Sequence, residues 1–420
     1  MEPQSRIGLA SLTKLAFDGV DLHPLHTELL QRCLREENSE AALMDLSVIE
    51  QLCGNRDQGL VWQAKALARH RVYRTESRHP AKHRLLVFAE AGHMGANTPI
   101  EFLLQNSAFD IITYYPDLDG GHPKALPEHD VAFCAAPADS ARAHGFYDTV
   151  RALSLLTGTE VLNRPESTVA LDRDQLAQMF AYVDGLRFPR TRRLTRHDLT
   201  SALATGTDDT LLSRVGHYPI IIRPCGSHAG DGLARIHHRE KLVSYLKRRK
   251  EQVFFLSEYV DYASPHDGSF RKYRVVFIDG KAYPCHMAIA DQWDLWYLNA
   301  DMHRSVIKRR EEEAFMDGFD QGFAARHQNQ LRALTDGIDL DYFGIDCAED
   351  PEGNLVVFEA DNALIVHDMD PETIFPYKRR HMHRIFSGFE EMLLRHCHPG
   401  DGSDAWQWGK TAGPAPRICA

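Results

Sequence analysis

Three carboxylates near the C-terminus occupy positions from which one metal ion could be held. Asp346 lies in the apolar stretch 340–347, and Glu359 and Asp361 lie in the stretch 354–362. An Asp-Pro-Glu-Gly turn between them predicts an antiparallel hairpin, in which Glu359 and Asp361 share a face and Asp346 can lie opposite. Carboxylates among apolar residues are costly unless a cation neutralises them, and oxygen ligands favour Mg²⁺ or Mn²⁺. A polar hairpin tip with solvated acids is the other interpretation of this segment.

A glycine-rich loop directly follows a strand-like segment that ends in Arg223. Three glycines within seven residues, Gly226, Gly230 and Gly232, let the backbone turn tightly and point N–H groups at an anion. Arg223 could then pair with phosphate oxygens. The spacing matches neither a Walker loop nor a dinucleotide fingerprint. The loop could also be only a turn.

Two further strand-like segments carry charged residues among apolar ones. The stretch 253–260 is apolar apart from Glu258 at its end. The stretch 270–281 reads as a strand followed by a tight Asp-Gly turn, after which the chain returns as a second strand. Arg274 is followed by two β-branched valines, so we expect it to face a site, with a half-exposed surface strand as the alternative.

The N-terminal part of the chain is interpreted as a helical leader. Residues 1–80 carry no strand signal, and apolar spacing between residues 43 and 68 predicts two helices broken by a Gly-Asn-Arg-Asp sequence. The resulting helical hairpin resembles a single tetratricopeptide-type unit, although no second copy follows at a fixed period.

The remainder of the chain divides into an α/β segment, an α+β segment and a tail. Over residues 83–165, short apolar runs flank a helix-like stretch, which predicts a small open α/β domain with strands at 84–89, 109–115 and 130–134. Residues 166–395 mix helix and strand signals, and residues 396–420, rich in Gly, Pro and Asp, are interpreted as a tail.

Length, charge and cysteine usage exclude several classes of protein. A chain of 420 residues predicts two or three domains. A formal charge of −11 argues against nucleic acid as the main partner. The sequence has no run of about 18 apolar residues and no signal-peptide character, so we expect a cytoplasmic protein without a membrane partner. The 8 cysteines are scattered, which suggests neither a zinc site nor a disulfide framework.

The order of these features resembles the ATP-grasp superfamily. It is most similar to the RimK-like carboxylate–amine ligases, some of which carry a helical, tetratricopeptide-like leader. The resemblance covers residues 83–395 and rests on the base with its glycine loop, the strand with Glu258, the Arg274 hairpin and the closing carboxylates. It implies a fold of mixed α/β and α+β class, in which two α+β subdomains clasp ATP after a small open α/β domain.

The resemblance also implies a role for each of these residues. Arg223 would contact the ATP phosphates under a mobile flap, formed by Gly226, Ser227, His228, Gly230 and Gly232. Adenine would be held by the strip Glu258, Tyr259 and Val260. Arg274 would act with Arg223 in catalysis by steadying the transferred phosphoryl group. Mg²⁺, or Mn²⁺, would be held by Asp346, Glu359 and Asp361.

Three positions depart from the family pattern. The phosphate-binding base is usually a lysine, and here it is Arg223. A second family lysine belongs to an Arg-Asp-Lys triplet, which here ends in Gln175, so that its charge is missing unless Arg173 or another residue replaces it. The metal-binding Glu-x-Asn reads Glu-x-Asp, with the extra carboxylate at Asp361.

The resemblance implies an ATP-dependent, ADP-forming ligase that joins a small-molecule or peptide carboxylate to an amine through an acyl phosphate. A kinase on the same scaffold and an ATP-binding regulatory or scaffold protein are the alternatives. Candidate substrate contacts are His93, His286 and Arg304. The aromatic-rich stretch 283–297 is either core packing or an apolar wall for substrate. The leader could recruit a partner or complete a homodimer.

Overall fold

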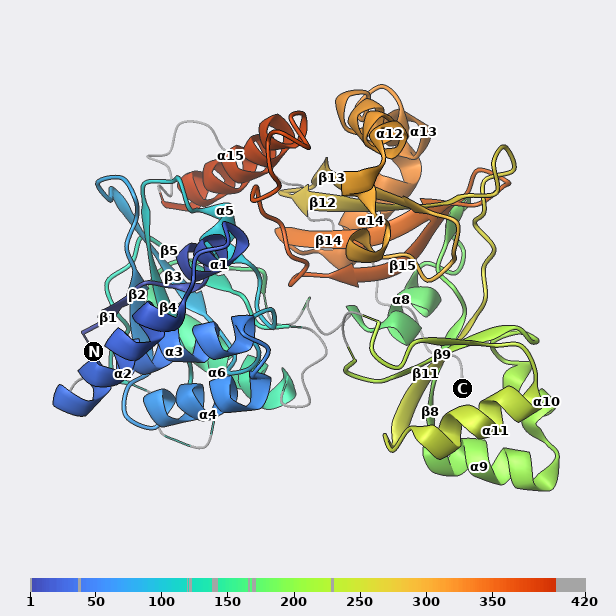
Figure 1. Cartoon of the computed structure of the whole chain (residues 1–420), viewed down its shortest axis with the longest axis horizontal. Coiled ribbons are helices and arrows are strands. Elements are labelled where there is room, and N and C mark those ends of the chain that lie inside the picture. Colours follow the sequence, from blue (N-terminus) through green and yellow to red (C-terminus); the bar gives the residue numbers. More distant parts are fainter. Residues whose placement is uncertain are drawn as a thin grey trace.

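Three β-sheets with helices packed on them make up the chain (Figure 1). The computed structural model describes residues 2–36, 39–118, 120, 123–137, 143–164, 167, 171–227 and 230–397. The expected mixed α/β and α+β class is confirmed by the element order. No helix in these described residues is long and apolar enough to span a bilayer. The predicted tail begins within the last helix, which ends at Cys397, and otherwise lies outside the described residues.

The first sheet combines the predicted open α/β domain with two strands from the N-terminal leader. Its strands, in spatial order, are β1 (Gln4–Arg6), β2 (Val72–Thr75), β4 (Phe109–Tyr114), β3 (His83–Phe88), β5 (Val131–Cys134) and β6 (Val161–Leu162). All neighbouring pairs are parallel except β2 and β4. The expectation that residues 1–80 contain no strand is therefore wrong. Both added strands are too short for side-chain alternation to be visible in the sequence.

The first sheet and the helices packed on it are called the first unit, and these helices include the predicted helical hairpin. It is formed by α3 (Glu40–Leu52) and α4 (Arg56–Leu67), and the intervening Gly54 has a φ of 87°, which favours glycine. Two earlier helices, α1 (Leu9–Phe17) and α2 (His23–Arg35), pack against α3. The unit also holds α5 (Ile100–Leu103) and α6 (Ala143–Thr157). A tetratricopeptide-type identity for the leader stays a prediction.

The second sheet is antiparallel and small. Its strands, in spatial order, are β10 (Ala234–Ile236), β9 (Ile220–Pro224), β11 (Val253–Glu258) and β8 (Thr191–Thr195). Its helices are α9 (Arg196–Thr205), α10 (Asp208–Leu212) and α11 (Arg239–Arg248). Alternation along β9 buries Ile220 and Ile222 with these helices, so Ile221 and Arg223 face the other way.

The third sheet carries the predicted arginine and carboxylate hairpins side by side. Its strands, in spatial order, are β13 (Lys281–Ala290), β12 (Phe270–Ile278), β14 (Tyr342–Glu349), β15 (Leu355–Asp361) and β7 (Leu186–Arg187). Positive φ at both Asp279 and Gly280 closes the first hairpin, as the Asp-Gly sequence predicts. Helices accompanying this sheet are α8 (Arg173–Met179), α12 (Val306–Asp317), α13 (Phe323–Arg326) and α14 (Gln328–Ile338).

The two faces of the third sheet differ in polarity. On β12, Tyr273 packs against Phe315 of α12 and Phe323 of α13, with ring centroids 4.8 and 5.0 Å apart. Lys272 and Arg274, its neighbours along the strand, point to the opposite face. The helix-covered face is therefore apolar, and the other face is left for charged side chains.

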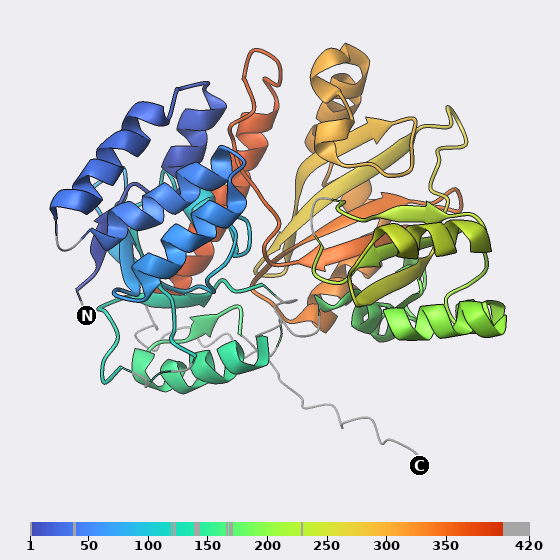
Figure 2. The same ribbon diagram turned by 60° about the horizontal axis from the view of Figure 1, so that its bottom comes forward.

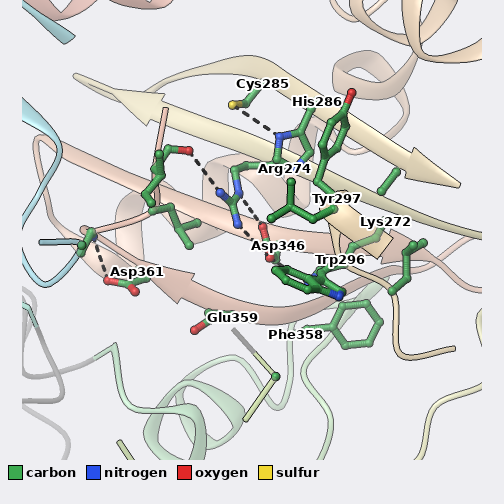
Figure 3. A pocket seen from close by; sticks show the side chains of 18 of the residues that line it. Lys272, Arg274, Cys285, His286, Trp296, Tyr297, Asp346, Phe358, Glu359 and Asp361 are labelled. Carbon is green, nitrogen blue, oxygen red and sulfur yellow. Dashed lines mark hydrogen bonds and ion pairs between the residues drawn. The ribbon is translucent and has the colours of Figure 1, made fainter. Parts of the chain in front are cut away.

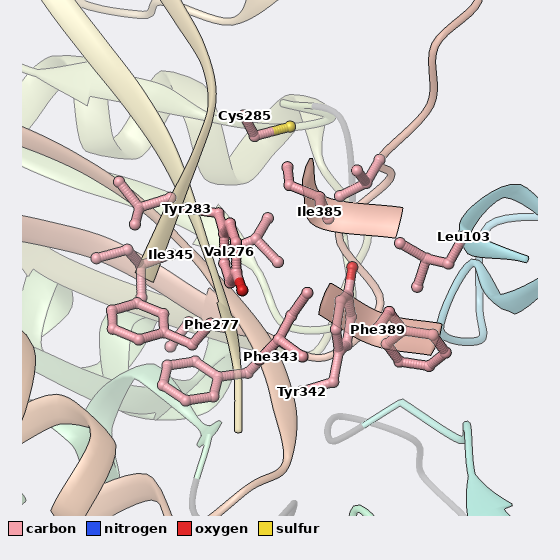
Figure 4. Packing of buried hydrophobic residues seen from close by; sticks show 14 of the residues in the cluster. Leu103, Val276, Phe277, Tyr283, Cys285, Tyr342, Phe343, Ile345, Ile385 and Phe389 are labelled. Carbon is pink, nitrogen blue, oxygen red and sulfur yellow. The ribbon is translucent and has the colours of Figure 1, made fainter. Parts of the chain in front are cut away.

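The C-terminal helix α15 (Lys378–Cys397) joins the first sheet to the third (Figure 2). Its Phe389 is fully buried, with its ring 5.7 Å from that of Phe133 on β5 and 5.4 Å from that of Tyr342 on β14. Figure 4 shows this helix packed among residues of the third sheet and Leu103 of α5. One continuous apolar core thus fixes the first unit beside the charged sheet.

A buried asparagine makes a second link between these parts of the chain. Asn163, just after β6, donates to the Tyr342 carbonyl and accepts from the Tyr342 N–H, each at 2.7 Å. Its own N–H donates to Asp341 Oδ2 at 2.6 Å, and its φ is 51°. Asparagine tolerates this left-handed conformation better than most residues.

Asn163→Ala is expected to lower the free energy of unfolding by about 3 kcal/mol. The substitution leaves both backbone groups of Tyr342 without partners and places alanine in the left-handed region. Urea unfolding followed by circular dichroism measures the change. Asn55→Ala, which removes an exposed amide bonded to Glu50, should change the value by less than about 0.5 kcal/mol. Equal effects of the two variants would contradict the assigned role of Asn163.

Candidate active-site cleft

A cleft of about 1400 Å³ is lined by residues from the parts of the chain built on each of the three sheets. The second sheet contributes Arg223 and the glycine loop, and the third sheet contributes its charged face. The first unit contributes α1 and the loop that contains His93. The volume exceeds that of a site for one drug-sized ligand, so two substrates can be accommodated together.

Four chemically active side chains form one row across the third sheet. The strand register pairs His286 of β13 with Arg274 of β12, Arg274 with Asp346 of β14, and Asp346 with Glu359 of β15. Residues directly opposite one another in neighbouring strands project to the same face. All four line the cleft, and Figure 3 shows them following one another in this order. Three strand spacings separate the ends of the row, roughly 14 Å.

Arg274 and Asp346 form a two-pronged ion pair at the centre of this row. Arg274 Nε lies 2.8 Å from Asp346 Oδ1, and its Nη2 lies 3.2 Å from Oδ2. Lys272 Nζ adds a third contact to Asp346 Oδ2 at 2.8 Å. Burial by itself would raise the pKa of Asp346, but the charges of Arg274 and Lys272 and their hydrogen bonds hold it far below its usual range. Two cations therefore converge on one buried carboxylate.

Arg173 plays the same part for Glu359 at the end of the row. Arg173 Nη2 lies 2.6 Å from Glu359 Oε1, and its Nη1 donates to the Phe358 carbonyl at 2.6 Å. Burial would raise the pKa of Glu359, but the charges of Arg173 and Arg223 lower it. Arg173 thus brings a cation to the cleft from the triplet Arg173-Asp174-Gln175.

The three carboxylates predicted to bind Mg²⁺ all line the cleft, and each has a bonding partner within the chain. Asp346 is bound by Lys272 and Arg274, Glu359 by Arg173, and Asp361 Oδ1 accepts the Ala363 N–H at 2.8 Å. Within the described part of the chain, no group of three or more His, Cys, Asp or Glu side chains is placed to hold a metal ion. Oxygen ligands of the right type are present, but cations neutralise them as they stand.

Arg223 folds back onto the glycine loop that follows it. It donates from Nη2 to the Ser227 carbonyl and from Nε to Ser227 Oγ, the latter at 3.3 Å. The predicted flap glycines Gly226, Gly230 and Gly232 have φ values of 70°, 75° and 69°. The loop thus depends on glycine conformations, as its sequence suggests. Gly226, Ser227 and Gly230 line the cleft, Gly232 does not, and His228 lies outside the described residues.

The predicted adenine strip Glu258, Tyr259 and Val260 also lines the cleft. The Glu258 carboxylate is bound by Arg190 at 2.9 Å and by Arg187 at 3.5 Å. The guanidinium of Arg235, on β10, stacks 3.7 Å from the centre of the Tyr259 ring, and the Trp293 ring meets that ring edge-on at 6.1 Å. The strip is therefore an apolar and aromatic surface with a charged border.

The three candidate substrate contacts are placed differently. His93 and His286 line the cleft, and His93 Nδ1 accepts the Gly95 N–H at 3.2 Å. Arg304 is not among the lining residues, because its side chain projects into solvent at 75% relative exposure. From the aromatic stretch, Trp293, Trp296 and Tyr297 line the cleft, which favours the apolar-wall interpretation for them.

Sequence reasoning missed two lysines of the cleft. Lys272 precedes Arg274 by two residues, so strand alternation alone could have placed both on one face. Lys378 lies on α15, and its Nζ is 2.7 Å from Asp370 Oδ2 and 3.5 Å from Glu312 Oε1. Nothing in the local sequence indicates that α15 reaches the cleft.

Comparisons with known proteins find structural but no sequence relatives. No family model and no curated protein matches the chain. The chain is similar in fold to a RimK-domain ATP-grasp protein from Sphaerobacter thermophilus, with 14% identity, a TM-score of 0.45, and coverage of 74% of this chain and 99% of that one. A D-alanine–D-alanine ligase from Bacillus anthracis complexed with ATP matches with 13% identity and a TM-score of 0.43, over 75% of this chain and 96% of that one. The VanG D-Ala:D-Ser ligase from Enterococcus faecalis matches with 13% identity and a TM-score of 0.45, over 76% of this chain and 100% of that one. With TM-scores below 0.5, these similarities assign neither a ligand nor an activity to this chain.

Proposed function

We propose that the chain is an ATP-dependent, ADP-forming ligase that joins a carboxylate to an amine. The observation that carries this proposal is the row His286–Arg274–Asp346–Glu359, which faces a cleft bordered by Arg223 and its glycine loop. Several cations, among them Arg173, Arg223, Lys272 and Arg274, border a cleft large enough for a nucleotide and a second substrate. Phosphoryl transfer needs such fixed positive charge, because negative charge spreads over the transferred oxygens.

In the proposed reaction, a substrate carboxylate oxygen attacks the γ-phosphorus of ATP. The bond from the γ-phosphorus to the bridging oxygen breaks, and ADP leaves with that electron pair. The amine nitrogen then attacks the acyl carbon, phosphate leaves, and one proton is lost from nitrogen. Arg274 lies at the centre of the row and Lys272 beside it, where both can stabilise the transferred group. Arg173 and Arg223 lie toward Glu359, where they can hold the remaining phosphates.

The cations that pair with Asp346 and Glu359 are already positioned for the negative charge of the phosphates. Arg173, Lys272 and Arg274 each have a carboxylate partner, so none of these three cations is left unpaired in its partly buried position. An incoming phosphate can compete for the same guanidinium and ammonium groups with charge-assisted hydrogen bonds. Binding of Mg²⁺ by Asp346, Glu359 and Asp361 stays a prediction, and the roles given above use only the cations of the chain itself.

Carboxylate-dependent ADP release tests the proposal. The protein is incubated with ATP and magnesium and with pairs drawn from the twenty amino acids, simple dicarboxylates and dipeptides. ADP is measured by a coupled assay, and products are identified by mass spectrometry. We expect ADP release that requires both partners and a product with the mass of an amide. A stable phosphorylated product would instead identify a kinase, and ATP binding without ADP release would identify a regulatory protein.

Arg173→Gln is expected to raise the KM for ATP about tenfold, with a smaller effect on kcat. The reason is the loss of one charge-assisted phosphate contact, for which tenfold in affinity is a moderate value. Steady-state kinetics at saturating acceptor measures the effect. Arg192→Gln removes the same charge from an exposed position on β8 and should leave the KM unchanged. A KM for ATP that is equal in both variants would show that Arg173 only partners Glu359.

A further inference from the structure

We infer that His286 is the base that accepts the proton of the attacking amine. This inference rests on the proposed ligase function and assigns its second half-reaction to one imidazole. Three observations support this inference. They are the position of His286 in the row, the ring nitrogen without a hydrogen bond, and the charges around the ring.

His286 lies one strand beyond Arg274, at the opposite end of the row from Glu359. It is the register partner of Arg274, and both side chains line the cleft. If the phosphoryl group is transferred near Arg274 to a carboxylate oxygen of the substrate, the acyl carbon bonded to that oxygen lies between the phosphates and β13. An amine that attacks from the side away from the phosphates therefore approaches past His286.

The imidazole has one ring nitrogen available for a proton. Its Nδ1 lies 4.0 Å from the Cys285 sulfur, a weak contact at most. Within the described part of the chain, Nε2 of His286 makes no hydrogen bond. His286 is half-buried, and a histidine in such a place that serves only a structural purpose commonly bonds through at least one of its nitrogens.

The ring is held in place by Tyr297 rather than by hydrogen bonds of its own. The two ring centroids are 4.6 Å apart (Figure 3). The Tyr297 hydroxyl donates to Glu312 Oε2 at 3.1 Å, and that oxygen also accepts from Tyr377 at 2.5 Å. Lys378 donates to the same Tyr297 hydroxyl and lies 4.0 Å from the centre of its ring. This buried network fixes the ring beside His286 and leaves the imidazole nitrogens unused.

Burial and the charges around His286 favour its neutral form. Burial lowers its pKa well below the usual value, and the positive charges of Arg274, Lys378 and Lys272 lower it further, against the opposing charge of Asp346. Lys378 is itself paired with Asp370 and Glu312. A neutral imidazole can accept a proton, and negative charge brought to Arg274 by an acyl phosphate would raise its basicity. The base thus becomes effective when the intermediate is in place.

The proton balance of the step is complete without another reactant. The amine nitrogen forms a bond to the acyl carbon, and the bond from that carbon to the phosphate oxygen breaks. Phosphate leaves with the electron pair, and the N–H proton passes to Nε2 of His286. The imidazolium then releases its proton to solvent after the products depart.

The two half-reactions can be measured apart, which makes the inference testable. Hydroxylamine traps an acyl phosphate as a hydroxamate and, since it is largely unprotonated at neutral pH, does not depend on a protein base. His286→Gln should lower amide formation with the amine found in the ADP screen by 10²–10³-fold. Hydroxamate formation with the same carboxylate should fall less than about threefold. The pH profile of amide formation should also lose one ionisation in this variant.

Matched controls separate this inference from the proposed function. His266→Gln changes an exposed histidine outside the cleft and should leave both rates unchanged. A His286→Gln variant that forms amide at the wild-type rate, or that loses both rates equally with an unaltered pH profile, overturns the role of His286 but leaves the ligase intact. A wild-type protein that yields neither hydroxamate nor carboxylate-dependent ADP overturns the ligase function, and the role of His286 with it.

Discussion

Arg274→Met is expected to lower carboxylate-dependent ADP release by 10²–10³-fold. Arg274 is the central cation of the row, and removing one fixed donor aimed at developing charge typically costs this much in rate. Methionine keeps most of the length of the side chain, so the packing around β12 is preserved. Initial rates of ADP formation at saturating ATP and carboxylate measure the effect. The KM for ATP should change far less than kcat, because Arg274 acts on the transferred group.

Arg271→Met is the matched control for this prediction. Arg271 lies on the opposite face of the same strand, where it pairs with Asp267 and Glu311, and it is not among the lining residues. Its replacement should leave kcat within about threefold of the wild type. An Arg274→Met protein that keeps more than a tenth of the wild-type rate would contradict the central role of that guanidinium.

Asp346→Ala is expected to remove activity and to lower the free energy of unfolding by about 3–5 kcal/mol. The variant leaves Arg274 and Lys272 in a largely buried place without their shared carboxylate, and an uncompensated buried charge is costly. Urea unfolding measures the stability, and ADP release measures the activity. Asp346→Asn keeps a hydrogen-bond acceptor of the same shape and should fall between the wild type and the alanine variant.

A surface ion pair provides the comparison for this stability effect. Asp18 pairs with Lys14 at 2.7 Å in an exposed position on the N-terminal side of the molecule. Asp18→Ala should change the free energy of unfolding by less than about 1 kcal/mol. If Asp346→Ala were no more destabilising than Asp18→Ala, the Arg274–Asp346–Lys272 cluster would not be the buried ion cluster described above.

Local patterns predicted the elements of the third sheet but not the row that crosses it. Alternation and turn residues marked β12, β13, β14 and β15, because those signals lie within about ten residues of one another. The row depends on which residues face each other across strands separated by up to about 70 positions in the sequence. That register is set by packing over the whole sheet, which no local motif encodes.

The charged residues of the cleft were likewise predictable one by one, whereas their pairing was not. Arg274, Asp346 and Glu359 were predicted from their strands, and the sequence also suggested that Arg173 could replace the missing lysine. The structure pairs Arg173 with Glu359, which no spacing could reveal. Lys378 comes from a helix whose main apolar contacts are with the first and third sheets, so its place beside Tyr297 follows only from tertiary packing.

The most direct test of the account follows the oxygen atoms of the carboxylate. The carboxylate identified in the ADP screen is prepared with ¹⁸O in both oxygens and turned over with ATP and the amine, and the phosphate released is analysed by mass spectrometry. If the carboxylate attacks the γ-phosphorus, one labelled oxygen per turnover appears in the phosphate and one remains in the amide. Phosphate without label would contradict an acyl phosphate, and with it the role assigned to the charged row.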